Sequence, residues 1–202
     1  MPGGEVRSVC VYCGSQNGTS SAYREAGRAL GRALARAGIG LVYGGGAKGI
    51  MGALADGALS AGGRVTGIIP RFLVAKEANG QSLERLSETV LTDDMHQRKH
   101  AMFDRSDAFV ALPGGIGTLE EIVEIMTWAQ LARHTKPIAL VNVGGFWDPL
   151  LALLDHMGAE GFIHAAHRVR PLVASDPVEV VAMIVAAAGR AAPQAERDIA
   201  RM

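Results

Sequence analysis

Short apolar runs alternate with longer stretches of helical period along almost the whole chain. Runs of this length predict strands, and the stretches between them predict helices. The expected strands cover residues 6–12, 39–43, 65–69, 89–91, 108–112 and 138–143, with a weaker seventh candidate at 169–173. Several of these runs are apolar without alternation, which is typical of parallel strands that are covered on both faces.

The helical stretches connect consecutive strands. In residues 22–37 the apolar positions form one stripe, which ends at Gly38; the stripe comprises Ala26, Leu30, Ala33, Leu34 and Ala37. Alternating strands and helices form βαβ units, whose right-handed crossovers produce a doubly wound sheet. We therefore predict an α/β fold, a single-domain doubly wound parallel sheet with helices on both faces. Residues 1–189 form this domain, residues 71–85 are an irregular insertion, and residues 190–202 are a frayed or loosely docked tail.

Composition fits one globular domain and excludes several classes of protein. The 202 residues are 49% hydrophobic, and 20 Lys and Arg balance 20 Asp and Glu, so the chain is neither disordered nor a strongly charged ligand of nucleic acid. The first residues lack a basic segment followed by an apolar one, and no apolar stretch approaches the ~20 residues that span a bilayer. We expect a cytoplasmic protein that binds neither nucleic acid nor membranes.

Two cysteines form a Cys-x-x-Cys at Cys10 and Cys13. A redox pair of this kind opens a helix, whereas Cys10 lies inside an apolar run, and no second pair completes a zinc site. We expect ordinary reduced thiols in or beside a buried strand.

Glycine follows three of the expected strands. Gly14 follows the first, residues 44–46 are all glycine and follow the second, and Pro-Gly-Gly-Ile-Gly-Thr at 113–118 follows the fifth. Any one run could be only a tight turn, but all three lie at the carboxyl edge of a parallel sheet, where ligands bind. The third run leads directly into a helix, so we predict a phosphate site there, with Thr118 as a helix cap that also offers its hydroxyl. Its residues are Gly114, Gly115, Gly117 and Thr118.

The standard nucleotide fingerprints fit poorly. Gly44, Gly46 and Gly49 match G-x-G-x-x-G, but they follow the second strand, and Arg71 stands near the end of the next one in place of a ribose-binding acid. NAD is therefore a second-rank candidate. Lys48 precedes Gly49 and no hydroxyl residue follows, so a P-loop is absent and ATP hydrolysis through one is disfavoured.

The helix after the phosphate turn carries an unusual carboxylate. We expect its core stripe to comprise Leu119, Ile122, Val123, Met126 and Ala129. Glu121 then projects from the opposite side, in the same direction as Ile125, Trp128 and Leu131. This second face of the helix is too apolar to be exposed to solvent. Another part of the chain or another subunit must cover it, and we infer a homodimer.

A cation is available to oppose this carboxylate. Residues 93–100 open a helix with acidic cap candidates, and its face carries Met95, Arg98 and Met102. Burial favours the protonated form of Glu121 and a nearby guanidinium opposes it. These glutamates could merely complement the helix dipole, with Arg98 and Lys99 in solvent; we accept that interpretation for Glu120 but not for Glu121 and Arg98, whose surroundings are apolar.

His96 and His100 have the spacing of the histidines in H-E-x-x-H. Gln97 replaces the general base of that motif, and the neighbouring Arg98 and Lys99 would repel a divalent cation. We expect no metal.

Three motifs together resemble one family. They are Pro-Gly-Gly-x-Gly-Thr-x-x-Glu at 113–121, Met-His-x-Arg-Lys at 95–99 and Tyr-Gly-Gly-Gly at 43–46. They resemble the LOG family, the cytokinin riboside 5'-monophosphate phosphoribohydrolases, which are often mislabelled lysine decarboxylases. The likeness runs from about Val9 to about Val185.

The resemblance implies a Rossmann-like homodimer without a cofactor, which hydrolyses the N-glycosidic bond between an adenine-type base and ribose 5'-monophosphate. By motif, Arg98 and Glu121 would be the catalytic pair, and the glycines and threonine at 114–118 would hold the phosphate. Residues expected to contact the rest of the nucleotide are Ser15, Gly45, Gly46, Met95 and Lys99. Gln16 departs from the family, in which two serines often follow the first strand.

The chemistry of the residues agrees with this activity. Cleavage of an N-glycosidic bond passes through an oxocarbenium-like state, which a nearby carboxylate stabilises. Glu121 can do this or take a proton from water. Arg98 is a poor proton donor, since its pKa exceeds ~12, and is expected to orient Glu121 and the nucleotide. The phosphate turn would supply remote binding energy.

Two other functions compete. A pyridoxal-phosphate decarboxylase needs a Schiff-base lysine, and none of Lys48, Lys76, Lys99 and Lys136 lies in a recognisable cofactor motif. A non-catalytic nucleotide-binding module could use the same sheet, although phosphate binding alone does not require the carboxylate of Glu121. The sequence leaves open the choice between AMP and N6-prenylated nucleotides.

Overall fold

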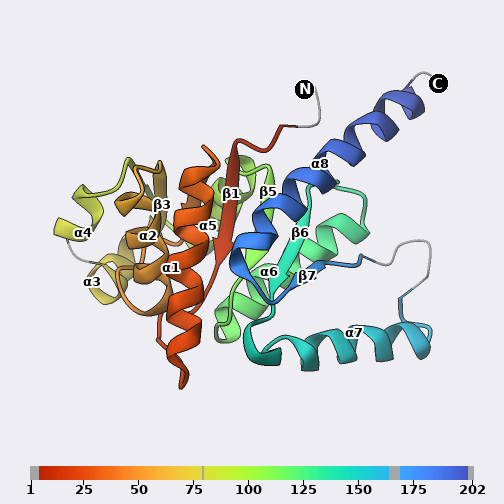
Figure 1. Ribbon diagram of the computed structural model, residues 1–202, viewed down its shortest axis with the longest axis horizontal. Helices are drawn as coiled ribbons and strands as arrows, with labels where there is room; N and C mark the ends of the chain where they lie inside the picture. Colours follow the sequence, from red (N-terminus) through yellow and green to blue (C-terminus); the bar gives the residue numbers. More distant parts are fainter. Residues whose placement is uncertain (1–4, 79, 164–168, 200–202) are drawn as a thin grey trace.

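The computed structural model describes residues 5–78, 80–163 and 169–199 (Figure 1). In these ranges the strands form one parallel sheet of seven, in the order β4-β3-β2-β1-β5-β6-β7. The strands are β1 (Ser8–Tyr12), β2 (Gly40–Tyr43), β3 (Val65–Pro70), β4 (Glu88–Thr92), β5 (Ala108–Ala111), β6 (Ile138–Val141) and β7 (Leu172–Ala174). The six expected strands and the weaker seventh are confirmed, with ends shifted by a few residues.

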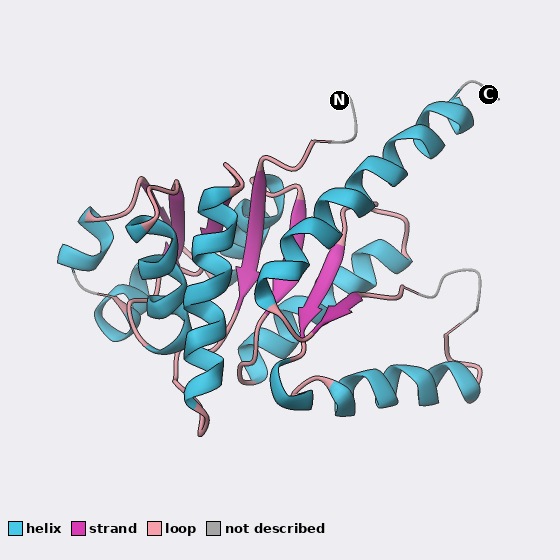
Figure 2. Cartoon of the chain, viewed as in Figure 1, coloured by secondary structure: helices cyan, strands magenta, loops and turns pink. Residues whose placement is uncertain are grey.

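Helices connect the strands and cover both faces of the sheet (Figure 2). The long ones are α1 (Ser21–Arg36), α2 (Gly49–Ser60), α5 (Met95–Asp104), α6 (Ile116–Gln130), α7 (Asp148–Ala159) and α8 (Pro177–Ile199). Short helices fill the insertion after β3, namely η1 (Arg71–Leu73), α3 (Val74–Glu77) and α4 (Gly80–Glu84), and η2 (Val143–Gly145) precedes α7. Residues 190–199 therefore continue α8, and the domain boundary expected at 189 stays a prediction.

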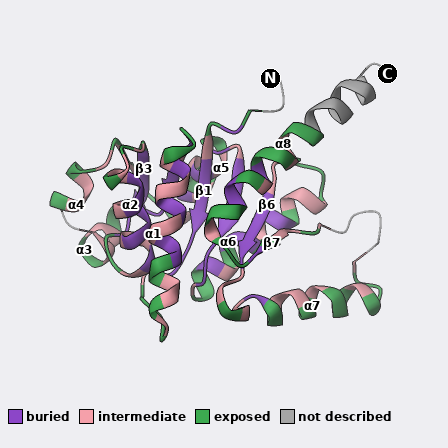
Figure 3. Cartoon of the chain, viewed as in Figure 1, coloured by how far each residue is buried: buried purple, intermediate pink, exposed green. Residues whose placement is uncertain are grey.

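The core has two halves, one on each face of the sheet. On one face, α1, α2 and α8 pack against side chains such as Val9 and Val11. On the other, α5, α6 and α7 pack against Cys10 and Phe109. Strands β1, β2, β3, β5 and β6 are almost wholly buried, whereas the edge strands β4 and β7 are partly exposed (Figure 3). The doubly wound arrangement with helices on both faces is confirmed.

Helices α1 and α2 approach each other through glycines. A Cβ on Gly31 would meet the carbonyl oxygen of Leu54 and, at 2.8 Å, the amide nitrogen of Ala58. Gly27 and Gly31 are thus part of the buried stripe of α1, together with the expected Ala26, Leu30 and Leu34. The prediction was wrong for Ala37, which is exposed, because the chain turns away at Gly38 (φ +71°).

The order in which the parallel strands are added to the sheet switches sides between β1 and β5. Strands β1 to β4 are added outward on one side, and β5 to β7 on the other. The loops after β1 and β5 therefore diverge from a common point, where the amide of Gly14 donates to the carbonyl of Pro113 at 3.1 Å. In open α/β sheets, a switch point of this kind at the carboxyl edge is where ligands bind. Within the described ranges, no helix combines the length and apolar character needed to cross a bilayer.

Candidate active site

A cavity of about 390 Å³ opens at this switch point. It is formed by the loop after β1, by α2, by the insertion after β3, and by the first turns of α5 and α6. Its described lining comprises Cys13, Gly14, Ser15, Met51, Leu73, Glu77, Met95, Arg98, Gly115, Ile116, Gly117, Thr118, Glu120 and Glu121. The cavity thus brings together residues from five separate parts of the sequence.

The N-terminus of α6 faces this cavity without a capping side chain. Gly115 is its N-cap residue and makes no side-chain hydrogen bond, so the prediction that Thr118 caps the helix was wrong. Since the first bond of the helix runs from the amide of Leu119 to the carbonyl of Gly115, the three preceding amides have no acceptor within the helix. A Cβ on Gly115 or Gly117 would meet nothing within 4 Å. These open amides and the helix dipole can hold an anion.

Gly114 lies beneath this turn and is required by packing. A Cβ there would meet the Thr118 hydroxyl and, at 2.9 Å, the amide nitrogen of Gly14. Gly114 does not itself belong to the described cavity lining. It allows the turn after β5 to close against the loop after β1.

Glu121 is buried one turn after Thr118, with 8% of its surface exposed. Burial raises the pKa of its carboxyl from 4.5 to about 7, while the Arg98 guanidinium opposes this rise and Glu120 and Glu77 add to it. The expectation that desolvation and a cation act against each other on this group agrees with its surroundings. The carboxyl therefore changes protonation state near neutral pH.

Arg98 is also buried, with 5% exposed. Helix α5 begins at the Asp94 cap, whose Oδ1 accepts from the amide of Gln97 at 2.8 Å, and this places Arg98 one turn inside. Its Nη2 donates to the carbonyl of Gly44 at 3.2 Å, and its Nη1 lies 3.8 Å from the sulfur of Met95. Its Nε is buried and has no partner among the described residues, so the guanidinium keeps donor capacity for a ligand.

Arg98 and Glu121 line the same cavity without forming an ion pair in the described part of the chain. The hydrogen bonds of Arg98 within the described residues go to Met95 and Gly44 rather than to Glu121. The positive charge of Arg98 lowers the pKa of Glu121, and both side chains face the same cavity.

The residues expected to contact the nucleotide fall into two groups. Ser15 and Met95 belong to the cavity lining. Gly45, Gly46 and Lys99 are not among its described members. The ammonium of Lys99 binds Glu120 at 2.7 Å and Glu124 at 3.0 Å, which ties α5 to α6. Contacts of these three residues with a ligand stay a prediction.

Glu77 also belongs to the cavity lining, and no sequence pattern singled it out. It comes from α3, in the insertion that had no periodic pattern, and its Oε2 is buried with no partner in the described structure. Its backbone carbonyl accepts from the amide of Ala47 at 2.8 Å, which fastens the insertion to the loop after β2. Only the position of residues 71–85 after a strand, at the carboxyl edge, hinted at a site.

The expected stripe of α6 was partly wrong. Glu121 does not project away from the core: it shares the buried face with Ile122, Ile125 and Met126, whereas Val123 is exposed. Rotation of the stripe by one position accounts for this. Trp128 is covered by the chain's own α5, with its ring 5.0 Å from that of Phe103. Leu131 is 65% exposed.

The described residues contain no candidate metal site, and their two cysteines form no disulfide. They contain no group of three or more His, Cys, Asp and Glu that could hold an ion. Cys10 and Cys13 are free and buried, as expected, and burial raises the pKa of both thiols well above the usual range.

The fold and this cavity define an open, doubly wound α/β protein whose ligand cleft has an anion-binding helix N-terminus beside a buried carboxyl and guanidinium. A family model described as "Possible lysine decarboxylase" matches residues 51–184. The probable cytokinin riboside 5'-monophosphate phosphoribohydrolase LOGL9 of Oryza sativa subsp. japonica is 49% identical over 162 residues, which cover 80% of this chain and 70% of the relative. LOGL2 of the same organism, with the same description, is 42% identical over 97% of this chain and 78% of its own length.

The chain therefore belongs to the LOG family. Among solved structures, the structural-genomics target TM1055 superimposes with a TM-score of 0.66 at 27% identity, covering 88% of this chain and 98% of that one. This likeness confirms the Rossmann-like fold.

Proposed function

We propose that this protein hydrolyses the N-glycosidic bond of adenosine 5'-monophosphate and its N6-substituted derivatives, releasing free base and ribose 5-phosphate. With N6-prenylated substrates this reaction activates cytokinin nucleotides, as the names of its relatives describe. One observation carries the proposal. The buried Glu121 carboxyl lies one turn beyond the open N-terminus of α6, in the same cavity as Arg98.

The phosphate anchors the substrate in this proposal. The free amides at the start of α6 and the Thr118 hydroxyl bind it, with the helix dipole adding to the attraction. Anchored there, the ribose lies along the first turns of α6, and its anomeric carbon comes near Glu121. Binding energy from the phosphate then positions the sugar for reaction.

Glu121 acts in its ionised form. As the bond from C1' to the base nitrogen breaks, positive charge develops on the sugar, and the carboxylate stabilises it. A water oxygen bonds to C1' as the bond from C1' to the base nitrogen breaks, and a proton of that water passes to Glu121. The departing base nitrogen takes up a proton from solvent, and Glu121 then releases its proton to solvent, which regenerates the carboxylate. The Arg98 guanidinium lowers the pKa of Glu121 against the effect of burial, which increases its ionised fraction near neutral pH, and it donates hydrogen bonds to the nucleotide.

The base is held by an apolar wall opposite α6. Met51, Leu73 and Met95 line that part of the cavity. A purine ring can pack against the two thioethers and the leucine. An N6 substituent would extend past Leu73 toward the insertion.

Amine decarboxylation has no support at this site. A Schiff base requires a lysine at the reacting centre, and the described lining of the cavity contains none. Lys99, the lysine nearest in sequence to Arg98, holds Glu120 and Glu124. The description of the matching family model does not agree with this arrangement.

Product analysis tests the activity. Incubation with AMP should yield adenine and ribose 5-phosphate in equal amounts, measured by chromatography. Glu121→Gln should abolish this release while AMP binding, measured by calorimetry, persists. Glu25→Gln, an exposed glutamate on α1, is the control and should remain active.

Binding of AMP without release of adenine by the wild type would show a non-catalytic nucleotide-binding module instead. Steady-state comparison of AMP with isopentenyl-AMP ranks the two substrates.

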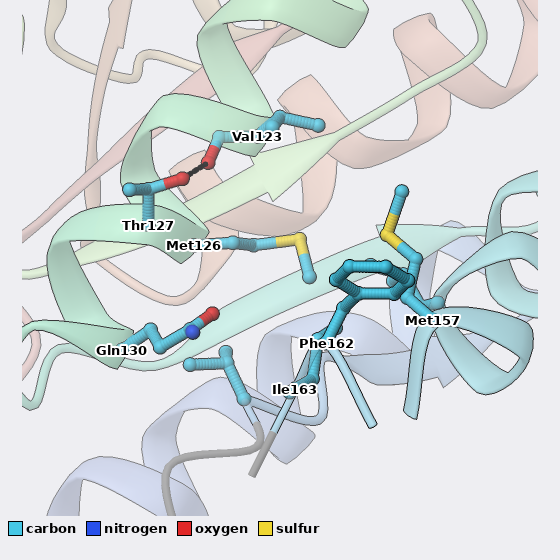
Figure 4. A pocket seen from close by; sticks show the side chains of 9 residues that line it. Val123, Met126, Thr127, Gln130, Met157, Phe162 and Ile163 are labelled. Atoms are coloured by element: carbon cyan, nitrogen blue, oxygen red, sulfur yellow. Dashed lines mark hydrogen bonds between the residues drawn. The ribbon is translucent and has the colours of Figure 1, made fainter. Parts of the chain in front are cut away.

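We also propose a homodimer through a face of α6 and α7. An apolar pocket of about 260 Å³ lies there. Its lining includes Val123, Met126, Met157 and Phe162 (Figure 4). Phe162 is 81% exposed. The Thr127 hydroxyl, on the same face, donates to the carbonyl of Val123 at 2.8 Å, so its donor is already used. A second copy would cover this apolar surface.

We place the enzyme in the cytoplasm. The free, buried thiols of Cys10 and Cys13 fit a reducing compartment.

A further inference from the structure

The cavity contains a second carboxylate that the proposed reaction does not yet use. Glu77 lines the cavity from α3, opposite the start of α6. Its Oε2 is buried and has no hydrogen-bond partner among the described residues. A buried carboxylate oxygen without a donor is costly, and such groups are rare unless a ligand satisfies them.

The backbone around Glu77 is held in place from the neighbouring loop. Its carbonyl accepts from the amide of Ala47 at 2.8 Å, and the amide of Ala78 donates to the carbonyl of Val74 at 3.0 Å. The side chain therefore enters the cavity from a fixed point. Glu77 also acts on Glu121 electrostatically, so the two carboxyls lie around the same space.

The missing partner must be a hydrogen-bond donor. An ionised carboxylate only accepts hydrogen bonds, and a phosphate offers it no proton and repels it. In an adenine nucleotide the remaining donors are the ribose hydroxyls and the exocyclic amine. Since Glu121 faces the anomeric carbon in the proposed function, the donor closest to the space shared with Glu77 is the hydroxyl on the adjacent carbon, C2'.

We propose that Glu77 binds the 2'-hydroxyl of the substrate ribose and makes the enzyme selective for ribonucleotides over 2'-deoxyribonucleotides. This inference rests on the proposed function for the identity of the sugar. The bond strengthens as the reaction proceeds, because positive charge at C1' makes the neighbouring hydroxyl a better donor. Glu77 therefore contributes to turnover as well as to binding.

The test compares AMP with 2'-deoxy-AMP for the wild type, Glu77→Gln and Glu77→Ala. A lost hydrogen bond to a charged group should lower kcat/KM for AMP about 10- to 100-fold. The value for 2'-deoxy-AMP should change by less than about 3-fold, since that substrate lacks the hydroxyl. The preference for AMP should therefore fall by about tenfold or more. Glu84→Gln, an exposed glutamate of the same insertion, is the matched control and should keep the wild-type ratio.

Three kinetic results would overturn the inference. Both substrates losing activity equally, in a variant that unfolds at the wild-type temperature, would make Glu77 a structural residue. Unchanged kinetics for both variants would remove it from the site. The third result involves purine riboside 5'-monophosphate, which lacks the exocyclic amine. If the Glu77 variants lose the preference for AMP over this compound but keep the preference for AMP over 2'-deoxy-AMP, Glu77 binds the base.

Binding separates this inference from the reaction itself. Calorimetry with Glu121→Gln should show tighter binding of AMP than of 2'-deoxy-AMP, and the double variant with Glu77→Gln should lose that difference. Equal affinities in Glu121→Gln alone would refute the contact. A wild type that binds AMP selectively but releases no adenine would refute the proposed function and leave the contact of Glu77 supported.

Discussion

Arg98 and Gly44 are in such close contact that only glycine is compatible with the arrangement. Arg98 Nη2 donates to the carbonyl of Gly44 at 3.2 Å, and a Cβ built on Gly44 would lie against the same nitrogen. The glycine run after β2 therefore determines where the guanidinium sits. Its role here is to position a charged group of the cavity.

Gly44→Ala should displace the guanidinium and lower kcat/KM for AMP by about 100-fold, since small shifts of positioning groups have effects of this size. The matched control is Gly189→Ala on α8, where a Cβ would meet nothing within 4 Å. That control should remain active and gain about 0.5–1 kcal/mol of stability from helix propensity. Full activity of Gly44→Ala would show that the position of Arg98 is unimportant.

The rate should rise with pH through about 7. Glu121 acts as a carboxylate, and its pKa is raised by burial to about 7, so kcat/KM for AMP should fall on the acid side of neutrality. A pH–rate profile between pH 5 and 9 measures this limb. A limb near pH 4.5 would mean that an unperturbed carboxyl controls the rate.

The same group makes stability depend on pH. Its pKa is higher in the folded than in the unfolded state, so the folded state binds more protons between pH 4.5 and about 7, and stability falls as pH rises through that interval. The shift corresponds to a loss on the order of 3 kcal/mol. Glu121→Gln should match the wild type at pH 4 and exceed it in denaturant unfolding at pH 8. Identical pH dependence in both proteins would contradict the raised pKa.

Arg98→Met should move the acid limb of the pH–rate profile, where kcat/KM falls, to higher pH. The guanidinium lowers the pKa of Glu121 against the effect of burial, so its removal should raise that pKa above about 7. Met retains much of the length and apolar contact of the stem. Residual activity measured against pH should show the shift, and a lower rate with an unmoved limb would mean that Arg98 serves only the substrate.

Val123→Asp, in the lining of the apolar pocket at the face of α6 and α7, should dissociate the proposed dimer. A charge at this exposed position on α6 would be buried without a partner in the interface, while the free protomer would tolerate it. Analytical ultracentrifugation should show monomers. Val178→Asp places the same charge on an exposed position of α8 and should leave the dimer intact. A wild type that sediments as a monomer would refute the proposal directly.

The sequence by itself determined the architecture. Apolar runs such as Val9–Cys10–Val11 cannot remain in water and are too short for helices, so the strands, their parallel direction and the edge that collects Gly14 and Gly115 followed from local pattern alone. The order of the strands came from the structure. Glu121 and Arg98 were also recognisable as candidate site residues, because a charged residue at a position surrounded by apolar helix positions is visible in the sequence itself.

Only the tertiary structure decided which face of α6 is buried and what else enters the cavity. Helical periodicity was ambiguous by one position when both faces of α6 were apolar, so Val123 and Glu121 were exchanged between the core and the outer side. Glu77 lies in a segment without periodicity. Glycine is needed at positions 27 and 31 of α1 because a Cβ there would meet atoms of α2. These features depend on contacts between residues distant in sequence, and such contacts leave no regular pattern along the chain.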